Sequence, residues 1–488
     1  MSKLQKLFKH TFIYGLATVL PRVISLILTR LYVQELNSTA DFGVYSGLFV
    51  YLILGNVLLS YGMETAFFRF MNKEEDKRKV QSTALTSLFV SSLSFFVVAL
   101  FARNFISEWL QYDVNLITFC VIILTLDALV VIPFAQLRNE GKSLTYVIIK
   151  IANVTVNLLL NLFFFLLLPK LKDNAFWDFF YFENQVYYIF ISNIMASLQT
   201  LVVLLPIYFK IRLDFSFVLW KKMFRYAFPV LIAGIAFAVN EGFDRVFLRM
   251  LLPVETADNT IGIYSACYKM GVFMTLFVTA YKLGVEPFFF SNAQDKNAPQ
   301  TYALVTEYFT IFGAFILLFI TVFTDIFKLI LINNPAYWEA LWVVPVVLLA
   351  NLCLGIYHSL SVWYKVTDRT QFGAYISILG MVITILLNFL LIPVISYKGA
   401  ALATLATYLV MMLVSYFVGQ RKYPIPYNIN KILFYLIFSV LASFFAFYVF
   451  DRNMYVGTFL LLLYIFVVFQ KEAGIRKMLK GYLSKKKA

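Results

Sequence analysis

The chain has 488 residues, of which 61% are hydrophobic and only 14% charged, and its mean hydropathy is +0.80. Soluble domains have roughly 45–50% apolar and about 25% charged residues, so this composition excludes a soluble protein and indicates a polytopic membrane protein. The net charge of +15 does not indicate nucleic-acid binding, because the basic residues lie in short connections between apolar segments.

Stretches of about 20 apolar residues, the length at which an α-helix crosses a bilayer, follow one another along the chain. They predict fourteen spans, at 11–33, 42–70, 80–101, 116–137, 144–168, 186–208, 224–249, 261–288, 301–323, 340–364, 371–394, 399–418, 432–450 and 454–470. The predicted fold class is therefore an all-α polytopic membrane protein with 14 transmembrane helices.

Lysine and arginine are shared unevenly between the connections. With the N-terminus inside, the even-numbered connections and the tail carry most of them, at 73–79, 210–225, 421–431 and 471–487. Cytoplasmic connections of membrane proteins carry an excess of these residues, so we expect both the N- and the C-terminus in the cytoplasm. The basic tail is expected to touch anionic lipid.

Two segments about 220 positions apart align without a gap. Arg30–Ser46 matches Arg249–Ser265, which places Gly43 on Gly262. Duplicated halves in a membrane protein are typical of transporters whose site lies between the halves. The repeat therefore favours a transport function.

A second set of echoes follows each copy. The pattern Gly-x-Glu-x-x-Phe-Phe occurs around Glu64 and again around Glu286, and a basic connection at Arg138 is matched by one at Lys365. Six predicted helices separate the copies, so both halves have the same orientation and a pseudo-twofold axis along the membrane normal. The predicted domains are an N-terminal six-helix half, a C-terminal six-helix half, and two further helices with a basic cytoplasmic tail, at 1–210, 211–422 and 423–488.

Ionisable residues inside membrane spans are costly and usually face a cavity or a partner. The spans hold eight cations and five anions: Arg22, Arg30, Arg69, Lys150, Arg245, Arg249, Lys269, Lys282, Glu64, Asp127, Glu241, Asp244 and Glu286. Some of these residues have a structural interpretation. Oppositely charged residues four positions apart on one helix face can neutralise each other, and arginines near span ends can extend to the lipid headgroups. Arg22, near the middle of the first span, is predicted to face a cavity.

The fifth span carries a polar stripe. Lys150, Asn153, Asn157 and Asn161 step by three or four positions and so share one helix face. Amides donate and accept hydrogen bonds, which suits sugar hydroxyls, and an ammonium group suits phosphate. The alternative is that the asparagines hold neighbouring helices together; we favour a cavity lining.

No pattern in the chain resembles an enzyme site. The two histidines, His10 and His358, share no metal-ligand spacing with cysteines or carboxylates, and no phosphate-cradling glycine-rich loop with lysine occurs. We therefore predict no catalytic residues, no metal site and no cofactor.

With this organisation the chain resembles the polysaccharide-transporter branch of the multidrug/oligosaccharidyl-lipid/polysaccharide (MOP) flippase superfamily. The resemblance covers nearly the whole chain. It is carried by Tyr226-Ala227-Phe228-Pro229, Asp244-Arg245, Gly262-Ile263-Tyr264-Ser265, Tyr268-Lys269, Asn388, Pro393 and Gly399-Ala400-Ala401.

The resemblance implies a V-shaped bundle, as in multidrug (MATE) transporters, with a cavity that alternates its access. It implies a flippase that moves undecaprenyl-diphosphate-linked oligosaccharides, the repeat units of polysaccharides such as the O-antigen of lipopolysaccharide, from the inner to the outer leaflet of the bacterial inner membrane. Basic residues on the first helix hold the diphosphate in this family, and Arg22 and Arg30 match that placement. Coupling to H⁺ or Na⁺ is common there, and Asp127, Glu64 and Asp244 are the candidates here.

The predicted substrate-binding residues combine both lines of reasoning: Arg22, Arg30, Lys150, Asn153, Asn157, Asn161, Arg249 and Lys269. The symmetry-related Arg30 and Arg249 are expected at the outer rim. The expected partners are the lipid-linked oligosaccharide, membrane lipids, a polysaccharide polymerase and glycosyltransferases.

Three alternatives stay open. A lipid II flippase shares the fourteen spans and a cationic cavity. A cation-coupled multidrug exporter would be expected to have an acidic and aromatic lining instead. A membrane glycan polymerase or ligase, which belongs to a different class of protein, generally needs a sizeable outside loop, and the outside connections predicted here are short.

Overall fold

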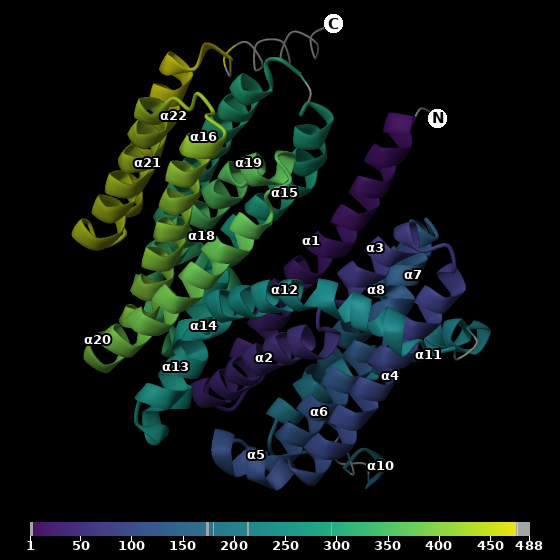
Figure 1. Ribbon diagram of the computed structural model, residues 1–488. Helices are drawn as coiled ribbons and strands as arrows, with labels where there is room; N and C mark the ends of the chain where they lie inside the picture. Colours follow the sequence, from purple (N-terminus) through teal and green to yellow (C-terminus); the bar gives the residue numbers. More distant parts are fainter. Residues whose placement is uncertain are drawn as a thin grey trace, which may run out of the picture. The chain divides into compact units, whose positions relative to one another are not determined.

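The computed structural model of the protein describes residues 3–171, 175–178, 180–211, 214–293, 295–474 and 476. This part of the chain folds almost entirely into helices (Figure 1). It forms two compact units, which we describe one at a time. Unit 1 is Met1–Ala266, Asn334–Tyr337 and Gln371–Ala403, and unit 2 is Cys267–Asn333, Trp338–Thr370 and Thr404–Ala488.

The first unit holds most of the N-terminal helices. They are α1 (Lys3–Glu35), α2 (Thr39–Ser60), α3 (Met63–Lys73), α4 (Lys77–Phe101), α5 (Arg103–Leu110), α6 (Val114–Leu129), α7 (Val131–Asn139), α8 (Ser143–Leu162), η1 (Phe163–Leu167), α9 (Leu168–Leu171), α10 (Ala175–Asp178), α11 (Val186–Lys210), α12 (Phe217–Gly242), α13 (Asp244–Leu251) and α14 (Val254–Tyr268), whose last residues pass into unit 2.

The remaining helices follow in the C-terminal part of the chain. They are η2 (Lys269–Gly271), α15 (Val272–Ser291), α16 (Ala298–Val322), α17 (Thr324–Leu331), η3 (Pro335–Trp342), α18 (Val343–Leu360), α19 (Val362–Val366), α20 (Gln371–Lys422), α21 (Ile429–Phe444), η4 (Phe445–Val449) and α22 (Met454–Lys471). Helix α20 contributes its first part to unit 1 and its last part to unit 2.

Among the described residues, twelve helices are long and apolar enough to cross a membrane, which confirms a multi-pass membrane protein. One of them, α20, covers two predicted spans. Its backbone leaves the helical conformation between these spans, at Ile395 and Ser396. Helix α1 lies over the first predicted span without being among the twelve. The count of fourteen, the cytoplasmic termini and the domain boundaries at 210 and 422 stay predictions.

The second predicted span is broken where α2 meets α3. Tyr61 and Gly62 have φ angles of 33° and 70°, and a Cβ atom on Gly62 would lie 2.7 Å from the carbonyl oxygen of Ala227 in α12. The left-handed backbone and the close approach both favour glycine at position 62. The break places Glu64 at the start of α3, on the wall of the cavity described below.

The core of unit 1 beside this break is formed by α3, α4, α7 and α12. Its fully buried side chains include Met63, Phe67, Leu85, Ile132 and Met223. Small residues let the helices approach one another within this cluster, as is usual in membrane bundles. This core packs α3 and α7, two of the helices that surround the cavity described below, against α4 and α12.

In unit 2 the two last helices, α21 and α22, lie side by side with α16 (Figure 1). The Lys431 ammonium group, at the start of α21, forms ion pairs with Glu307 of α16 at 3.0 Å and with Glu472, just beyond α22, at 2.8 Å. Tyr435 donates a hydrogen bond to Glu472 at 2.9 Å. These polar contacts fasten the C-terminal helix pair to the rest of its unit.

Candidate functional site

A polar cavity of about 430 Å³ lies within unit 1. Side chains from α2, α3, α6, α7, α8 and α11 surround it. The polar and charged members of the lining are Asn56, Ser60, Glu64, Asp127, Lys150, Asn153, Asn193, Ser197 and Thr200. Four predicted site residues thus come together here: Glu64, Asp127, Lys150 and Asn153.

The Asp127 carboxylate of α6 is held from two sides. Ser197 of α11 donates a hydrogen bond to Oδ1 at 2.7 Å, and Asn56 of α2 donates to Oδ2 at 3.4 Å. Hydrogen bonds to a carboxylate are stronger than those between neutral groups. Asp127 therefore ties three helices together and presents its charge to the cavity.

Lys150 of α8 extends over the ring of Phe134, with 4.5 Å from Nζ to the ring centroid. Its ammonium group and the Asp127 carboxylate interact electrostatically. Among the residues that the structure describes, however, Lys150 forms no salt bridge. The aromatic face supports the cation by a cation–π contact and leaves its N–H donors open to an anion.

Helix α11 supplies a second polar face, which sequence reasoning missed. Asn193, Ser197 and Thr200 step by four and three positions and all line the cavity. The Nδ2 group of Asn153 donates a hydrogen bond to Thr200 Oγ1 at 3.0 Å, which joins the two faces. The same periodicity that singles out the stripe of the fifth span was present in the sixth, without a charge to draw attention to it.

Glu64 on the cavity wall forms an ion pair with Arg138 at the end of α7. The repeat-equivalent residues form the same pair in unit 2, where Lys365 Nζ lies 2.5 Å from Glu286 Oε1. Glu64 is aligned with Glu286, and Arg138 with Lys365, in the sequence repeat. An equivalent ion pair is therefore present once in each unit.

The C-terminal part of the polar stripe on α8 contributes to helix packing. The buried Asn161 accepts a hydrogen bond from the Tyr32 hydroxyl of α1 at 2.9 Å and donates to the Asn157 carbonyl oxygen at 2.8 Å. Neither Asn157 nor Asn161 is among the residues lining the cavity. The bond to Tyr32 is an interhelical hydrogen bond, which was the alternative interpretation of this stripe. Contact of Asn157 or Asn161 with sugar stays a prediction.

Three predicted cationic site residues are not among the residues that line this cavity. Arg22 is half-buried and Arg30 exposed on α1, and Lys269 is half-buried in the short turn η2. Each has contacts of its own within the protein. Their role in holding a diphosphate stays a prediction.

Asp244, a predicted coupling residue, is buried in a local network between α13 and α14. It pairs with the neighbouring Arg245 at 2.8 Å and accepts a hydrogen bond from the Tyr264 hydroxyl at 2.5 Å. Arg245 Nε donates to Ser265 at 3.1 Å. The four residues belong to the motifs that carry the family resemblance, and here they fix the bend between two helices.

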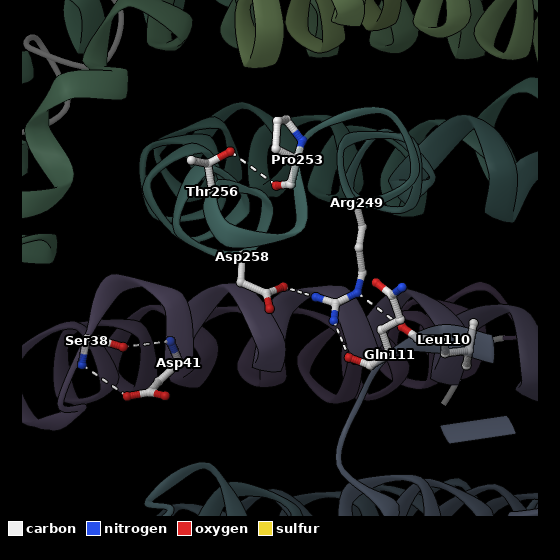
Figure 2. Close-up of polar contacts among 8 residues, drawn as sticks. All are labelled: Ser38, Asp41, Leu110, Gln111, Arg249, Pro253, Thr256 and Asp258. Atoms are coloured by element: carbon white, nitrogen blue, oxygen red, sulfur yellow. Dashed lines mark hydrogen bonds and ion pairs between the residues drawn. The ribbon is translucent and has the colours of Figure 1, made fainter. Parts of the chain in front are cut away.

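Arg249 is engaged on every side (Figure 2). Its guanidinium group pairs with Asp258 of α14 and donates to the carbonyl oxygens of Leu110 at 3.2 Å and Gln111 at 2.5 Å. Tyr112 packs against its face, 3.6 Å from the ring centroid. The side chain is only 11% exposed, so Arg249 fastens the end of α5 to α13 and α14.

Replacing Arg249 with alanine is expected to lower the midpoint of thermal unfolding by several degrees. Hydrogen bonds of charged groups contribute about 1.5–3 kcal/mol each, and their buried partners are left unsatisfied. Arg103→Ala is the matched control, because Arg103, at the start of α5, is exposed and forms no salt bridge among the described residues. Thermal unfolding of the purified variants measures the difference, and equal midpoints for both would contradict the structural role of Arg249.

The aligned glycines of the repeat meet one another in unit 1. A Cβ atom on Gly43 would collide with the carbonyl oxygen of Asp258, and one on Gly262 would collide with the carbonyl oxygen of Thr39. Thr39 and Asp258 are themselves aligned, so each contact is the image of the other under a pseudo-twofold axis. Helices α2 and α14 therefore cross at backbone contact through this glycine pair.

Within the described ranges no group of three or more His, Cys, Asp or Glu side chains is placed to hold a metal ion. What the cavity offers instead is one ammonium group, two carboxylates, and several amides and hydroxyls. Such groups bind polyhydroxylated and anionic molecules by hydrogen bonds and charge.

A multi-span helical bundle with a polar cavity among its helices is the architecture of a membrane transporter. The polysaccharide biosynthesis protein family matches residues 7–292, more than half of the 488 residues. The chain belongs to this family, and family and fold together place it in the MOP flippase superfamily. A comparison with curated protein sequences gave no match.

Solved structures of flippases and transporters share the fold. The lipid II flippase MurJ in an inward closed conformation has a TM-score of 0.72 at 13% identity, over 94% of this chain and 99% of that one. An inward-facing multidrug resistance MATE family transporter of the MOP superfamily has a TM-score of 0.64 at 10% identity, over 86% and 98%. A MOP superfamily transporter from Pyrococcus furiosus, described as having a binding pocket of reversed polarity, has a TM-score of 0.57 at 11% identity, over 86% and 98%.

Proposed function

We propose that the protein is a flippase that moves undecaprenyl-diphosphate-linked oligosaccharide, the repeat unit of a bacterial polysaccharide, from the inner to the outer leaflet of the inner membrane. Membership of the polysaccharide biosynthesis protein family supports the involvement of glycan. Translocation needs no covalent chemistry, only a path in which the polar headgroup is hydrogen-bonded while the lipid tail stays in the bilayer.

The observation that carries the proposal is the polar lining around Lys150. Its ammonium group lies in one cavity with amides and hydroxyls that include Asn153, Asn193 and Thr200. Amides suit sugar hydroxyls and an ammonium group suits phosphate. In this proposal Lys150 binds the anionic part of the headgroup and Asn153 contacts sugar, while Asp127 and Glu64 are the candidates for coupling to H⁺ or Na⁺.

A lipid II flippase is the second candidate, because the MurJ fold covers 94% of this chain. A multidrug exporter is less well supported. Its organic cations would be repelled by Lys150, although Asp127 lies in the same cavity. The three functions differ in what accumulates when the protein is removed.

Deletion in the source bacterium separates them. We expect the lipid-linked oligosaccharide to accumulate in the inner leaflet and the surface polysaccharide to be lost, with normal cell-wall synthesis and unchanged drug sensitivity. Mass spectrometry of the lipid-linked intermediates, together with surface-glycan staining, measures this. Accumulation of lipid II with lysis, or hypersensitivity to cationic drugs with normal surface glycan, would overturn the proposal.

A further inference from the structure

A second cavity in unit 1, an apolar groove, plays no part in the proposed translocation. It has a volume of about 390 Å³ and lies between α4 and the start of α12. The side chains of its wall used below are Tyr61, Ser87, Val90, Phe217, Trp220 and Phe224.

The wall formed by α12 is a ladder of stacked aromatic rings. Phe217 and Trp220 stack with 5.5 Å between ring centroids, and Trp220 and Phe224 stack with 5.3 Å. Rings stacked along a helix form a smooth, rigid and apolar surface. A flexible hydrocarbon chain fits such a surface, because it requires no directional contact.

The polar ends of the aromatic residues are turned to a single hydroxyl group. Trp220 Nε1 donates a hydrogen bond to Ser87 Oγ at 2.8 Å, and the Tyr61 hydroxyl lies 2.5 Å from the same atom. The polar groups of Trp220, Tyr61 and Ser87 are thus hydrogen-bonded within the protein. The space that remains offers little to a sugar headgroup.

A basic stripe runs along α12 beside the aromatic ladder. Lys221 follows Phe217 by four residues and Arg225 follows Lys221 by four, so both lie on the helix flank next to the rings. Both side chains are exposed. Among the described residues neither forms a salt bridge, so their charge is available to an external anion.

The groove opens on an apolar surface. Val90 on α4 is 54% exposed and Phe217 on α12 is 63% exposed, which is typical of helix faces that meet lipid. By the charge distribution of the sequence, the connection that precedes α12 is cytoplasmic, and the cytoplasmic leaflet is rich in anionic lipid. The apolar surface that a lipid tail needs and the basic residues that an anionic headgroup needs therefore lie together at this groove.

We propose that this groove is a binding site for an anionic glycerophospholipid, with an acyl chain against the aromatic ladder and the phosphate at Lys221 and Arg225. The apolar lining distinguishes it from the polar cavity around Lys150, where the glycan substrate is expected. Phospholipid binding here is independent of the proposed flippase function.

Trp220 itself reports occupancy. The full-length protein is reconstituted into phosphatidylcholine vesicles with increasing fractions of phosphatidylglycerol brominated on its acyl chains, and the Trp220 signal is obtained by subtracting a Trp220→Phe variant. A basic residue near the membrane contributes about 1 kcal/mol toward an anionic lipid. We therefore expect half-maximal quenching at a fraction at least roughly fivefold lower for brominated phosphatidylglycerol than for brominated phosphatidylcholine.

The double variant K221Q/R225Q is expected to lose this preference, while R421Q/K422Q, which removes the same charges from another basic connection, is expected to keep it. Equal quenching by both lipids in the unmodified protein would overturn the proposal, as would a preference that survives K221Q/R225Q. Relief of the quenching by equimolar undecaprenyl diphosphate would assign the groove to the lipid carrier and would overturn it as well.

Discussion

Replacing Lys150 with methionine is expected to reduce export of the surface polysaccharide by at least about tenfold, because the proposed binding site for the anionic headgroup then lacks its ammonium group. A hydrogen bond to a charged group contributes about 1.5–3 kcal/mol, which corresponds to roughly 10- to 150-fold in binding. Lys150→Arg keeps the charge and is expected to retain much of the export. Quantitative surface-glycan staining of a complemented deletion strain, with the protein level checked, measures both.

Lys142→Met is the matched control for this prediction. Lys142 is an exposed basic residue at the start of the same helix, where it pairs with Glu140 at 2.7 Å. The Glu140 carboxyl has a lowered pKa chiefly because it accepts a hydrogen bond from Lys142, so this variant removes a surface ion pair and leaves the cavity unchanged. Export at the normal level in Lys150→Met would remove Lys150 from the substrate path.

A double variant distinguishes substrate binding from simple neutralisation of Asp127. Because Asp127 is also a candidate coupling residue, D127N alone is the reference. If Lys150 only balances the Asp127 charge, D127N/K150M restores neutrality and exports as much as D127N alone. If Lys150 binds the anionic headgroup, the double variant exports much less than D127N alone. We expect the second outcome, since Lys150 and Asp127 share the cavity without forming a salt bridge.

The variants Gly43→Ala and Gly262→Ala are each expected to destabilise the protein by roughly 1–3 kcal/mol, the usual range for overpacking. The atoms that a new methyl group would meet are backbone carbonyl oxygens of Asp258 and Thr39. These atoms have no rotamer by which to move aside, so α2 and α14 must separate. Heating purified protein in detergent and measuring the monodisperse fraction by size-exclusion chromatography gives the midpoint.

Gly284→Ala controls for the loss of a glycine from a helix. Position 284 lies inside α15 with open space around the added atom, and alanine is about 1 kcal/mol better than glycine in a helix interior. We expect this variant to be as stable as the unmodified protein or more so. Unchanged midpoints for both Gly43→Ala and Gly262→Ala would show that the crossing is not in backbone contact.

The helices and the repeat were accessible from the sequence, because hydropathy and internal similarity report them directly. The alignment of Gly43 with Gly262 predicted equivalence, and the structure adds that the two positions touch. The alignment of Arg138 with Lys365 predicted matching connections, and both prove to hold ion pairs. Contact between equivalent positions depends on how helices pack, which a one-dimensional pattern does not contain.

The residues lining the cavity could be predicted from the sequence only in part, for the same reason. Charged residues stand out in an apolar span, so Asp127 and Lys150 were found, whereas Ser197 and Asn56 were missed because uncharged polar residues are common in packed helices. Asn161 shows the converse. It shares a face with Lys150, yet it bonds to Tyr32. Facing the same side of a helix does not mean facing the same neighbour along its whole length.

Flipping by purified protein in proteoliposomes tests the central claim most directly. Undecaprenyl-diphosphate-linked oligosaccharide carrying a fluorescent sugar is incorporated, and a membrane-impermeant reductant reports label that reaches the outer leaflet. The account predicts faster exposure of this lipid than of labelled lipid II, with the difference lost in Lys150→Met. Exposure of lipid II at an equal or higher rate, or transport of a cationic dye alone, would contradict it.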